Sequence, residues 1–293
     1  MKKKFLDPNI KFKKETAEKI QLYQFNAKEL PLPTEIEISE SGVCNRKCSF
    51  CPRSAPDFKD INEFISEELV LKVSKELGEL NYKGVIRFSG FVEPLLDKKI
   101  FKHISTMKKH IPNSRIEIVT NGDPLNKERL LKLFDSGLDK ILISIYDGEK
   151  EYNEFAKMIK ESGIKKEQFI LRKRYFSEDL DFGITLSNRA GLMENAEFKI
   201  SKLSKPLEQL CYIPSYTLFF DYLGDVLMCP HDWGKKIILG NIQKEKIIDI
   251  WFNERSLKIR KQLGSQNRRF SPCNVCDVDG TLMGSKNSEY FTK

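Results

Sequence analysis

Residues 41–52 read Ser41-Gly42-Val43-Cys44-Asn45-Arg46-Lys47-Cys48-Ser49-Phe50-Cys51-Pro52, with three cysteines in the spacing C-x3-C-x2-C. Cysteine thiolates are the usual ligands of iron–sulfur clusters, and a four-iron cube normally takes four of them. A cube held by only three leaves one iron open to a ligand from outside the protein. A zinc site is the main alternative, but structural zinc has four protein ligands, and no His or fourth Cys follows nearby.

The triad Cys44, Cys48 and Cys51, placed after the alternating residues Ile36 and Ile38, resembles the radical S-adenosylmethionine (SAM) superfamily. In that superfamily the amine and carboxylate of SAM occupy the open iron. The resemblance therefore implies a [4Fe-4S] cluster and SAM as cofactors, and reductive cleavage of SAM to a 5′-deoxyadenosyl radical. This chemistry belongs to the cofactors rather than to the polypeptide.

Apolar runs of strand length alternate with helical patterns from about residue 35 to 190, which is typical of a parallel α/β sheet or barrel. The predicted strands are 35–38, 85–88, 116–119, 141–145, 169–171 and 184–186. The predicted helices include 69–77, 100–107, 130–134 and 152–159, with Ser66 as the cap of the first and Gly137 and Gly163 after the last two. Six strand-led units are too few for a closed eight-strand barrel. The predicted fold class is therefore α/β, a partial (β/α)6 barrel, as the superfamily resemblance also implies.

We expect three parts: an N-terminal arm (1–33), the barrel (34–196) and a small C-terminal domain (197–293). The arm is Lys-rich and is predicted to be irregular with one helix. In the C-terminal domain, the apolar runs 216–220 and 225–228 predict a hairpin around Gly224. Residues 246–263 predict one helix, and the polar tail from Ser265 predicts a loop.

A second set of cysteines lies entirely in the C-terminal part: Cys211, Cys229, Cys273 and Cys276. The pair Cys273-x2-Cys276 suits zinc and iron–sulfur equally well, so a structural zinc remains an alternative. The arrangement resembles the auxiliary-cluster domain called twitch, the shortened form of the SPASM domain. The resemblance implies one auxiliary [4Fe-4S] cluster with four thiolate ligands.

Ligands of such α/β sheets bind beyond the carboxyl ends of the strands. There, Ser89-Gly90-Phe91-Val92-Glu93-Pro94 resembles the superfamily's G-G-E-P segment, which holds the SAM amine. Glu93 and Pro94 match that segment, whereas Phe91 and Val92 replace the glycine pair. Asn121 follows the next strand and is a turn residue that could also contact the cofactor. Ser144 sits where superfamily members often place a hydroxyl that contacts the ribose, although it could equally be a small residue of the packed barrel.

Basic residues follow the last predicted strands. Arg172 and Arg174 are catalytic candidates that could pair with the SAM carboxylate or with an anion of the substrate, and Arg189 is a candidate for cofactor binding. His231 follows Cys229 closely, so we expect it beside the auxiliary cluster and treat it as a catalytic candidate. The other histidines, His103 and His110, are predicted to be surface residues.

The overall composition narrows the function classes. No apolar run approaches the length of a membrane span and no signal segment is evident, so we expect a cytoplasmic protein. The net charge of +8 comes from 50 basic and 42 acidic residues interleaved along 293 positions, which makes nucleic acid an unlikely partner. The excess fits an anionic small substrate equally well.

Among radical SAM enzymes, the chain looks most like those of modest length that oxidise a secondary alcohol of a sugar or aminocyclitol. In this interpretation the deoxyadenosyl radical removes a hydrogen atom from carbon and a base removes the hydroxyl proton. The auxiliary cluster then accepts the remaining electron, and an external donor such as flavodoxin or ferredoxin reduces the first cluster. Modification of a ribosomal peptide and epimerisation of a carbohydrate are the enzymatic alternatives. A non-enzymatic alternative is a metal- or nucleic-acid-binding protein.

Overall fold

The computed structural model describes residues 8–54, 58–90, 92–175, 186–196 and 198–293, and its centre is one large sheet. The described strands of this sheet are β3 (Glu35–Ser39), β6 (Val85–Phe88), β7 (Arg115–Thr120), β8 (Lys140–Ile145), β9 (Phe169–Lys173), β10 (Thr217–Asp221), β11 (Asp225–Leu227) and β12 (Ile238–Asn241). Their spatial order is β12-β11-β10-β3-β6-β7-β8-β9. The neighbours from β10 to β9 all pair in parallel, which confirms the predicted α/β fold class. The predicted strand at 184–186 lies outside the described residues except for Leu186.

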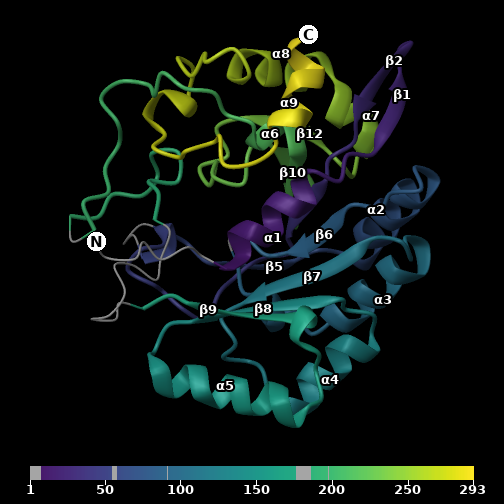
Figure 1. The fold of residues 1–293 in the computed structure, drawn as a ribbon, viewed down its shortest axis with the longest axis vertical. Helices are drawn as coiled ribbons and strands as arrows, with labels where there is room; N and C mark the ends of the chain where they lie inside the picture. The colour runs from purple at the N-terminus through teal and green to yellow at the C-terminus, as the bar shows by residue number, and fades with distance from the viewer. Residues whose placement is uncertain (1–7, 55–57, 91, 176–185, 197) are drawn as a thin grey trace.

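Helices cover the outer face of this sheet, and Figure 1 shows α4 and α5 on the side away from α1. The helices after the first strands are α2 (Glu67–Glu79), α3 (Ile100–His110), α4 (Lys127–Asp135) and α5 (Glu149–Glu161). β8 is buried at every position, as expected for a strand covered on both faces. The Ser66 side chain accepts a hydrogen bond from the Leu69 amide, so the predicted cap of α2 is confirmed. No helix in the described ranges has the length and apolar character needed to cross a membrane.

The N-terminal segment is more ordered than predicted. It contains the expected helix, α1 (Pro8–Ala17), and also a hairpin of β1 (Leu22–Phe25) and β2 (Lys28–Pro31) that sequence analysis missed. The hairpin turns at Asn26 and Ala27, whose φ angles are 46° and 61°. A two-residue turn with both φ angles positive is normally signalled by glycine, and the second position here is alanine.

Phe12 fixes α1 against the sheet. The Arg115 guanidinium carbon lies 4.1 Å and the Lys140 Nζ 3.5 Å from the centroid of its ring. Both cations stand at the first residue of their strands, β7 and β8. α1 therefore packs across the starts of two central strands.

The C-terminal part continues the sheet instead of standing apart from it. The predicted hairpin is confirmed as β10 and β11, with Gly224 at a φ of +81°, and β10 pairs in parallel with β3. The single helix predicted over 246–263 is wrong. It is two helices, α7 (Ile247–Phe252) and α8 (Glu254–Leu263), because Asn253 is extended and caps α8 through its side chain.

The polar tail is also more ordered than predicted. It ends in α9 (Ser285–Thr292), in which Phe291 packs edge-on against Trp251 with ring centroids 6.4 Å apart. Short 3-10 turns complete the described elements: η1 (Pro52–Ser54), η2 (Pro94–Leu96), η3 (Lys166–Gln168) and η4 (Cys273–Val275). A short helix, α6 (Ile213–Tyr216), and a small ladder of β4 (Ser41–Gly42) with β5 (Ile61–Phe64) flank the two cysteine-bearing regions.

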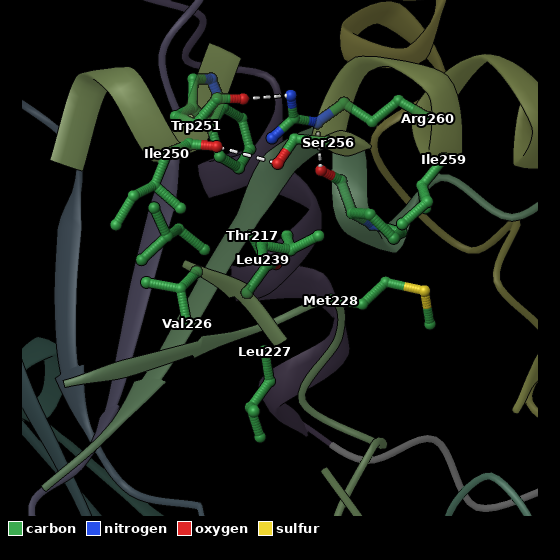
Figure 2. Close-up of a pocket in the computed structure, with 12 residues that line it drawn as sticks. Thr217, Val226, Leu227, Met228, Leu239, Ile250, Trp251, Ser256, Ile259 and Arg260 are labelled. Carbon is green, nitrogen blue, oxygen red and sulfur yellow. Dashed lines mark hydrogen bonds between the residues drawn. The ribbon is translucent and has the colours of Figure 1, made fainter. Parts of the chain in front are cut away.

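Figure 2 shows the core that α7 and α8 form with the hairpin of β10 and β11. The buried Arg260 donates hydrogen bonds to the carbonyls of Pro214 (2.8 Å) and Trp251 (2.6 Å), and the Ser256 hydroxyl donates to the Ile250 carbonyl (2.8 Å). The cavity among these residues is about 10 Å³, which is at most the space of one water. This region is packed core, not a ligand site.

His103 was predicted at the surface and is buried, with 1% of its area exposed. Its Nε2 lies 3.1 Å from the Asp97 Oδ2. The predicted helical pattern placed His103 between apolar neighbours, but it did not indicate that Asp97, just before the helix, would accommodate a buried imidazole. His110 is half-buried at the end of α3.

Candidate functional site

A cavity of about 590 Å³ opens at the carboxyl ends of the parallel strands, and Cys44, Cys48 and Cys51 line it together. Most of the predicted site residues line the same cavity: Glu93, Asn121, Ser144, Arg172, Arg174, Arg189 and His231. Pro94 is not among its lining residues. Pro94 is buried and begins the 3-10 turn that Glu93 caps, so its place in the structure is that of a loop-shaping residue.

The loop between Cys44 and Cys48 is tied to the ends of two strands by Arg46. Its guanidinium bonds to Asp123 (Nη2–Oδ1, 2.5 Å) after β7 and to Asp147 (Nη2–Oδ2, 2.8 Å) after β8. These carboxylates, Asp123 foremost, raise the pKa of Arg46 above its ordinary value. Sequence analysis missed Arg46, because nothing local to the loop indicates partners 77 and 101 positions away.

Glu93 is a buried carboxylate that lines the cavity and is the predicted partner of the SAM amine. It is 1% exposed and accepts hydrogen bonds from the Thr120 hydroxyl (2.5 Å) and from the amides of Asn121 (2.7 Å) and Leu95 (3.0 Å). Burial nevertheless raises the pKa of Glu93 to about 7, against a usual value of 4.5. A cation bound at this carboxylate would favour its ionised form.

The Glu93 loop is also joined to the cysteine loop, since the Glu93 amide donates to the Val43 carbonyl (3.0 Å). The Asn121 side chain continues this connection by donating to the Asn45 Oδ1 (2.7 Å). Gly90, at a φ of +99°, supplies a glycine backbone at the start of the same loop. Hydrogen bonds therefore fix the Glu93 loop against the cysteine loop, even though Phe91 and Val92 replace the glycine pair in the sequence.

Three consecutive basic residues, Arg172 and Lys173 of β9 and Arg174 just after it, point in alternating directions. Arg172 pairs in register with Ser144 of β8, and Arg172 and Arg174 both line the cavity with it. Lys173 points to the other face, where its Nζ bonds to Glu149 and lies 4.8 Å from the centroid of the Tyr152 ring. Successive strand residues face opposite sides, so only two of the three cations can act in the cavity.

Arg189 and His231 meet on the side of the cavity nearest the second cysteine set. The Arg189 Nη1 and the Ser187 Oγ each lie 3.4 Å from the His231 Nδ1. Burial, with the charge of Arg189 as a second cause, lowers the pKa of His231 to about 3. His231 is therefore a neutral imidazole at physiological pH.

Cys211, Cys229, Cys273 and Cys276 line a second, smaller cavity, which His231 also lines. The remaining walls are mainly apolar, with Ile213, Met228 and Leu263 among them. Burial raises the pKa of each of these thiols. The four thiols thus lie around one small, mainly apolar cavity.

Both cysteine sets fit iron–sulfur clusters. The first set offers three thiols in a cavity that also contains polar groups for a further ligand. One of these is the Arg189 Nε, which is buried and has no hydrogen-bond partner among the described residues. The second set offers four thiols, the usual ligand number of a four-iron cube, in mainly apolar surroundings.

The N-terminal helix supplies part of the cavity wall, which sequence analysis did not predict. Asn9, Ile10 and Lys13 of α1 line the cavity, and the Lys13 Nζ lies 3.6 Å from the Glu35 Oε1. The helix reaches the site because Phe12 holds it across the sheet.

Comparison with known proteins agrees with this geometry. The sequence model of the Radical SAM superfamily matches residues 38–175, and that of an iron–sulfur cluster-binding domain, SPASM, matches residues 211–277. The chain is 32% identical over 248 residues to the S-adenosyl-L-methionine-dependent 2-deoxy-scyllo-inosamine dehydrogenase of Niallia circulans, covering 83% of this chain and 92% of the relative.

Solved structures give the same result. The crystal structure of BtrN in complex with AdoMet and 2-DOIA superposes with a TM-score of 0.73 and 29% identity, over 86% of this chain and 96% of BtrN. The structure of anSMEcpe with bound AdoMet superposes with a TM-score of 0.52 at 15% identity, over 89% and 92% of the two chains. At that identity the likeness concerns the fold alone.

Proposed function

Because the chain belongs to the radical SAM superfamily, we propose that it oxidises a secondary alcohol of a sugar- or aminocyclitol-type small molecule. The observation that carries this proposal is the similarity to a dehydrogenase of an aminocyclitol, which extends over most of both chains. The retention of four C-terminal thiols, in a segment that matches an iron–sulfur domain, supports it. The enzyme has SAM and iron–sulfur clusters as its cofactors.

Cys44, Cys48 and Cys51 would hold the cluster that SAM completes. When bound, these cofactors supply abstraction of a hydrogen atom from a substrate C–H bond. Glu93 would hold the SAM amine, since a charge-assisted hydrogen bond to a buried carboxylate is strong. Arg189, with its unpartnered Nε among the described residues, would pair with the SAM carboxylate.

Asn121 and Ser144 would contact the rest of SAM. Both line the cavity, and both lie at or just beyond the ends of central strands. Pro94 would act indirectly, by fixing the loop in which Glu93 stands.

The substrate would lie toward Arg172, Arg174 and His231. The two arginines line the cavity from the end of β9 and the position just beyond it and would orient hydroxyl groups or pair with an anionic group of the substrate. His231 is neutral, so its imidazole would accept a hydrogen bond from the hydroxyl being oxidised. Its site between the two cavities suits a role at the reacting alcohol.

Cys211, Cys229, Cys273 and Cys276 would hold a cluster through protein ligands alone, which suits electron transfer better than binding of substrate. This is why we favour a dehydrogenase over an epimerase. An external donor of the flavodoxin or ferredoxin type would reduce the first cluster, and a cytoplasmic location fits that requirement.

The test is an anaerobic assay of the iron-loaded protein with SAM, dithionite and a panel of aminocyclitols and sugars, neutral and phosphorylated. We expect 5′-deoxyadenosine and a product two hydrogens lighter than its substrate, detected by mass spectrometry. The variant with Cys44, Cys48 and Cys51 replaced by Ala is the control, and it should form neither. A product of unchanged mass and inverted configuration would establish an epimerase instead, and cleavage of SAM by the triple variant would contradict the assignment of the triad.

A further inference from the structure

Arg189 lies between the two cysteine sets. Its guanidinium carbon is 5.4 Å from the centroid of the Trp233 ring, and its Nη1 is 3.4 Å from the His231 Nδ1. Arg189 lines the larger cavity together with Cys51, and the backbone amide of its neighbour His231 donates to the Cys229 Sγ (3.4 Å). One of these cysteines belongs to the triad and the other to the C-terminal set, so a single guanidinium lies near both.

Asn188 clasps the backbone that carries this arginine. Its backbone N–H donates to both carboxylate oxygens of Asp277 (2.9 and 3.0 Å), the residue directly after Cys276. Its side chain donates to the carbonyls of Val275 (2.7 Å) and Ser201 (3.0 Å). Asn188 is 0% exposed, so these bonds join the loop bearing Arg189 to the loop that ends in Cys276.

The backbone conformation shows how tightly the position is specified. Arg189 and Ala190 have φ angles of 48° and 52°, followed by Gly191 at 85°. Residues other than glycine adopt this left-handed region at a cost, and they persist there when the surroundings fix them. The Asn188 Oδ1, which accepts from the Gly191 amide (3.1 Å), is part of that fixing.

We propose that Arg189 is a positive charge shared by the two cluster sites, held in place by the Asn188 clasp, and that it raises the reduction potential of the auxiliary cluster. Reduction adds a negative charge to a cluster, and cluster potentials respond to nearby charge and to hydrogen bonds at the sulfurs. A cation in poorly solvated surroundings therefore favours the reduced form more strongly than one in water would. The His231 amide, which donates to the Cys229 Sγ (3.4 Å), acts in the same direction.

This inference rests on the two iron–sulfur sites and not on the substrate or the reaction outcome. Its test accordingly needs neither. The variant with Cys44, Cys48 and Cys51 replaced by Ala retains only the C-terminal site, so an anaerobic redox titration followed by electron paramagnetic resonance reports the auxiliary cluster alone. Iron content is measured first in every variant.

In that background, Arg189→Gln should lower the equilibrium constant for one-electron reduction at least about tenfold, which is a potential about 59 mV lower. Arg189→Lys keeps the charge and should stay near the parent value. Arg269→Gln is the matched control, because it removes the same charge from an exposed position shortly before Cys273 in the sequence, where solvent screens it. An unchanged potential in Arg189→Gln with its iron intact would overturn the proposal.

Asn188→Ala separates placement from charge, because it removes no charge. The backbone bonds to Asp277 remain, but the side-chain bonds of the clasp to Val275, Ser201 and Gly191 are lost, so the potential should move in the same direction as in Arg189→Gln. A potential equal to that of the parent would remove the clasp from the proposal. If Arg189→Gln does not retain its iron, the comparison of Asn188→Ala with the parent decides the proposal by itself.

Discussion

At the scale of single residues, Glu93 combines two properties that oppose each other. It accepts three hydrogen bonds, which favour the carboxylate, yet burial raises its pKa to about 7. The unliganded protein therefore loses stability as pH rises from about 4.5 to 7, because the folded state holds the Glu93 proton more tightly than the unfolded chain does. A bound amine that donates hydrogen bonds to the carboxylate reverses the preference.

The first prediction concerns SAM affinity and pH. If the Glu93 carboxylate holds the SAM amine, affinity should be complete above pH 7 and should fall below it, by about tenfold between pH 8 and pH 6. Glu93→Gln should weaken binding by about 1–3 kcal/mol at pH 8 and should remove the pH dependence in this range. Equilibrium binding of SAM to the iron-loaded protein measures both. Equal pH profiles in the two proteins would mean that another group holds the amine.

At the scale of elements, α1 is both a structural support and a wall of the cavity. Phe12 lies against Arg115 and Lys140, while Asn9 and Lys13 face the cavity from the same helix. The segment thus links the starts of β7 and β8 to the space where ligands bind.

Phe12→Ala should therefore lower the midpoint of thermal unfolding, by an amount equivalent to about 1–3 kcal/mol, since two cation–π contacts and some apolar burial are lost. Phe12→Leu keeps most of the apolar contact and isolates the contribution of the ring, expected at about 1–2 kcal/mol. The substrate KM should rise in Phe12→Ala because the α1 wall of the cavity loosens. Identical midpoints in wild type, Phe12→Leu and Phe12→Ala would show that α1 contributes nothing to this packing.

Elements also show where sequence reasoning succeeds. The α2 cap at Ser66, the hairpin around Gly224 and the first five predicted strands of the parallel sheet are marked by local signals, and these are confirmed. The β1–β2 hairpin and α9 carry no such signal, because one turns at Asn26-Ala27 and the other is polar along most of its length. Their formation depends on contacts with distant parts of the chain.

At the scale of the whole molecule, the candidate site was predictable to the extent that parallel strands bring their carboxyl ends together. That rule gathered Glu93, Asn121, Ser144, Arg172 and Arg174, all of which line one cavity with the triad. It could not reveal Arg46, whose partners follow two other strands, or the clasp at Asn188, whose partners include Val275 and Asp277 in the loop around Cys276. Such contacts connect separate loops and leave no spacing pattern in the sequence.

The C-terminal part is joined to the barrel through the sheet itself. β10 pairs with β3 along its full length, and β11 and β12 extend the same sheet. The second cysteine set is therefore built onto the scaffold that holds the first, and His231 stands between their cavities. This continuity fits the proposed division of labour, in which one site initiates oxidation and the other accepts an electron.

The claim that the first cluster initiates oxidation and the second accepts an electron is tested most directly by comparing two products in one variant. In this variant Ala replaces Cys211, Cys229, Cys273 and Cys276. Iron content should fall by about half if each cube holds four irons, and circular dichroism establishes that the fold persists, since metal sites can also stabilise small domains. In the anaerobic assay with substrate, we predict that 5′-deoxyadenosine still forms while the ketone does not. Ketone formation at the wild-type rate would contradict the role of the auxiliary cluster as electron acceptor, and with it the preference for a dehydrogenase.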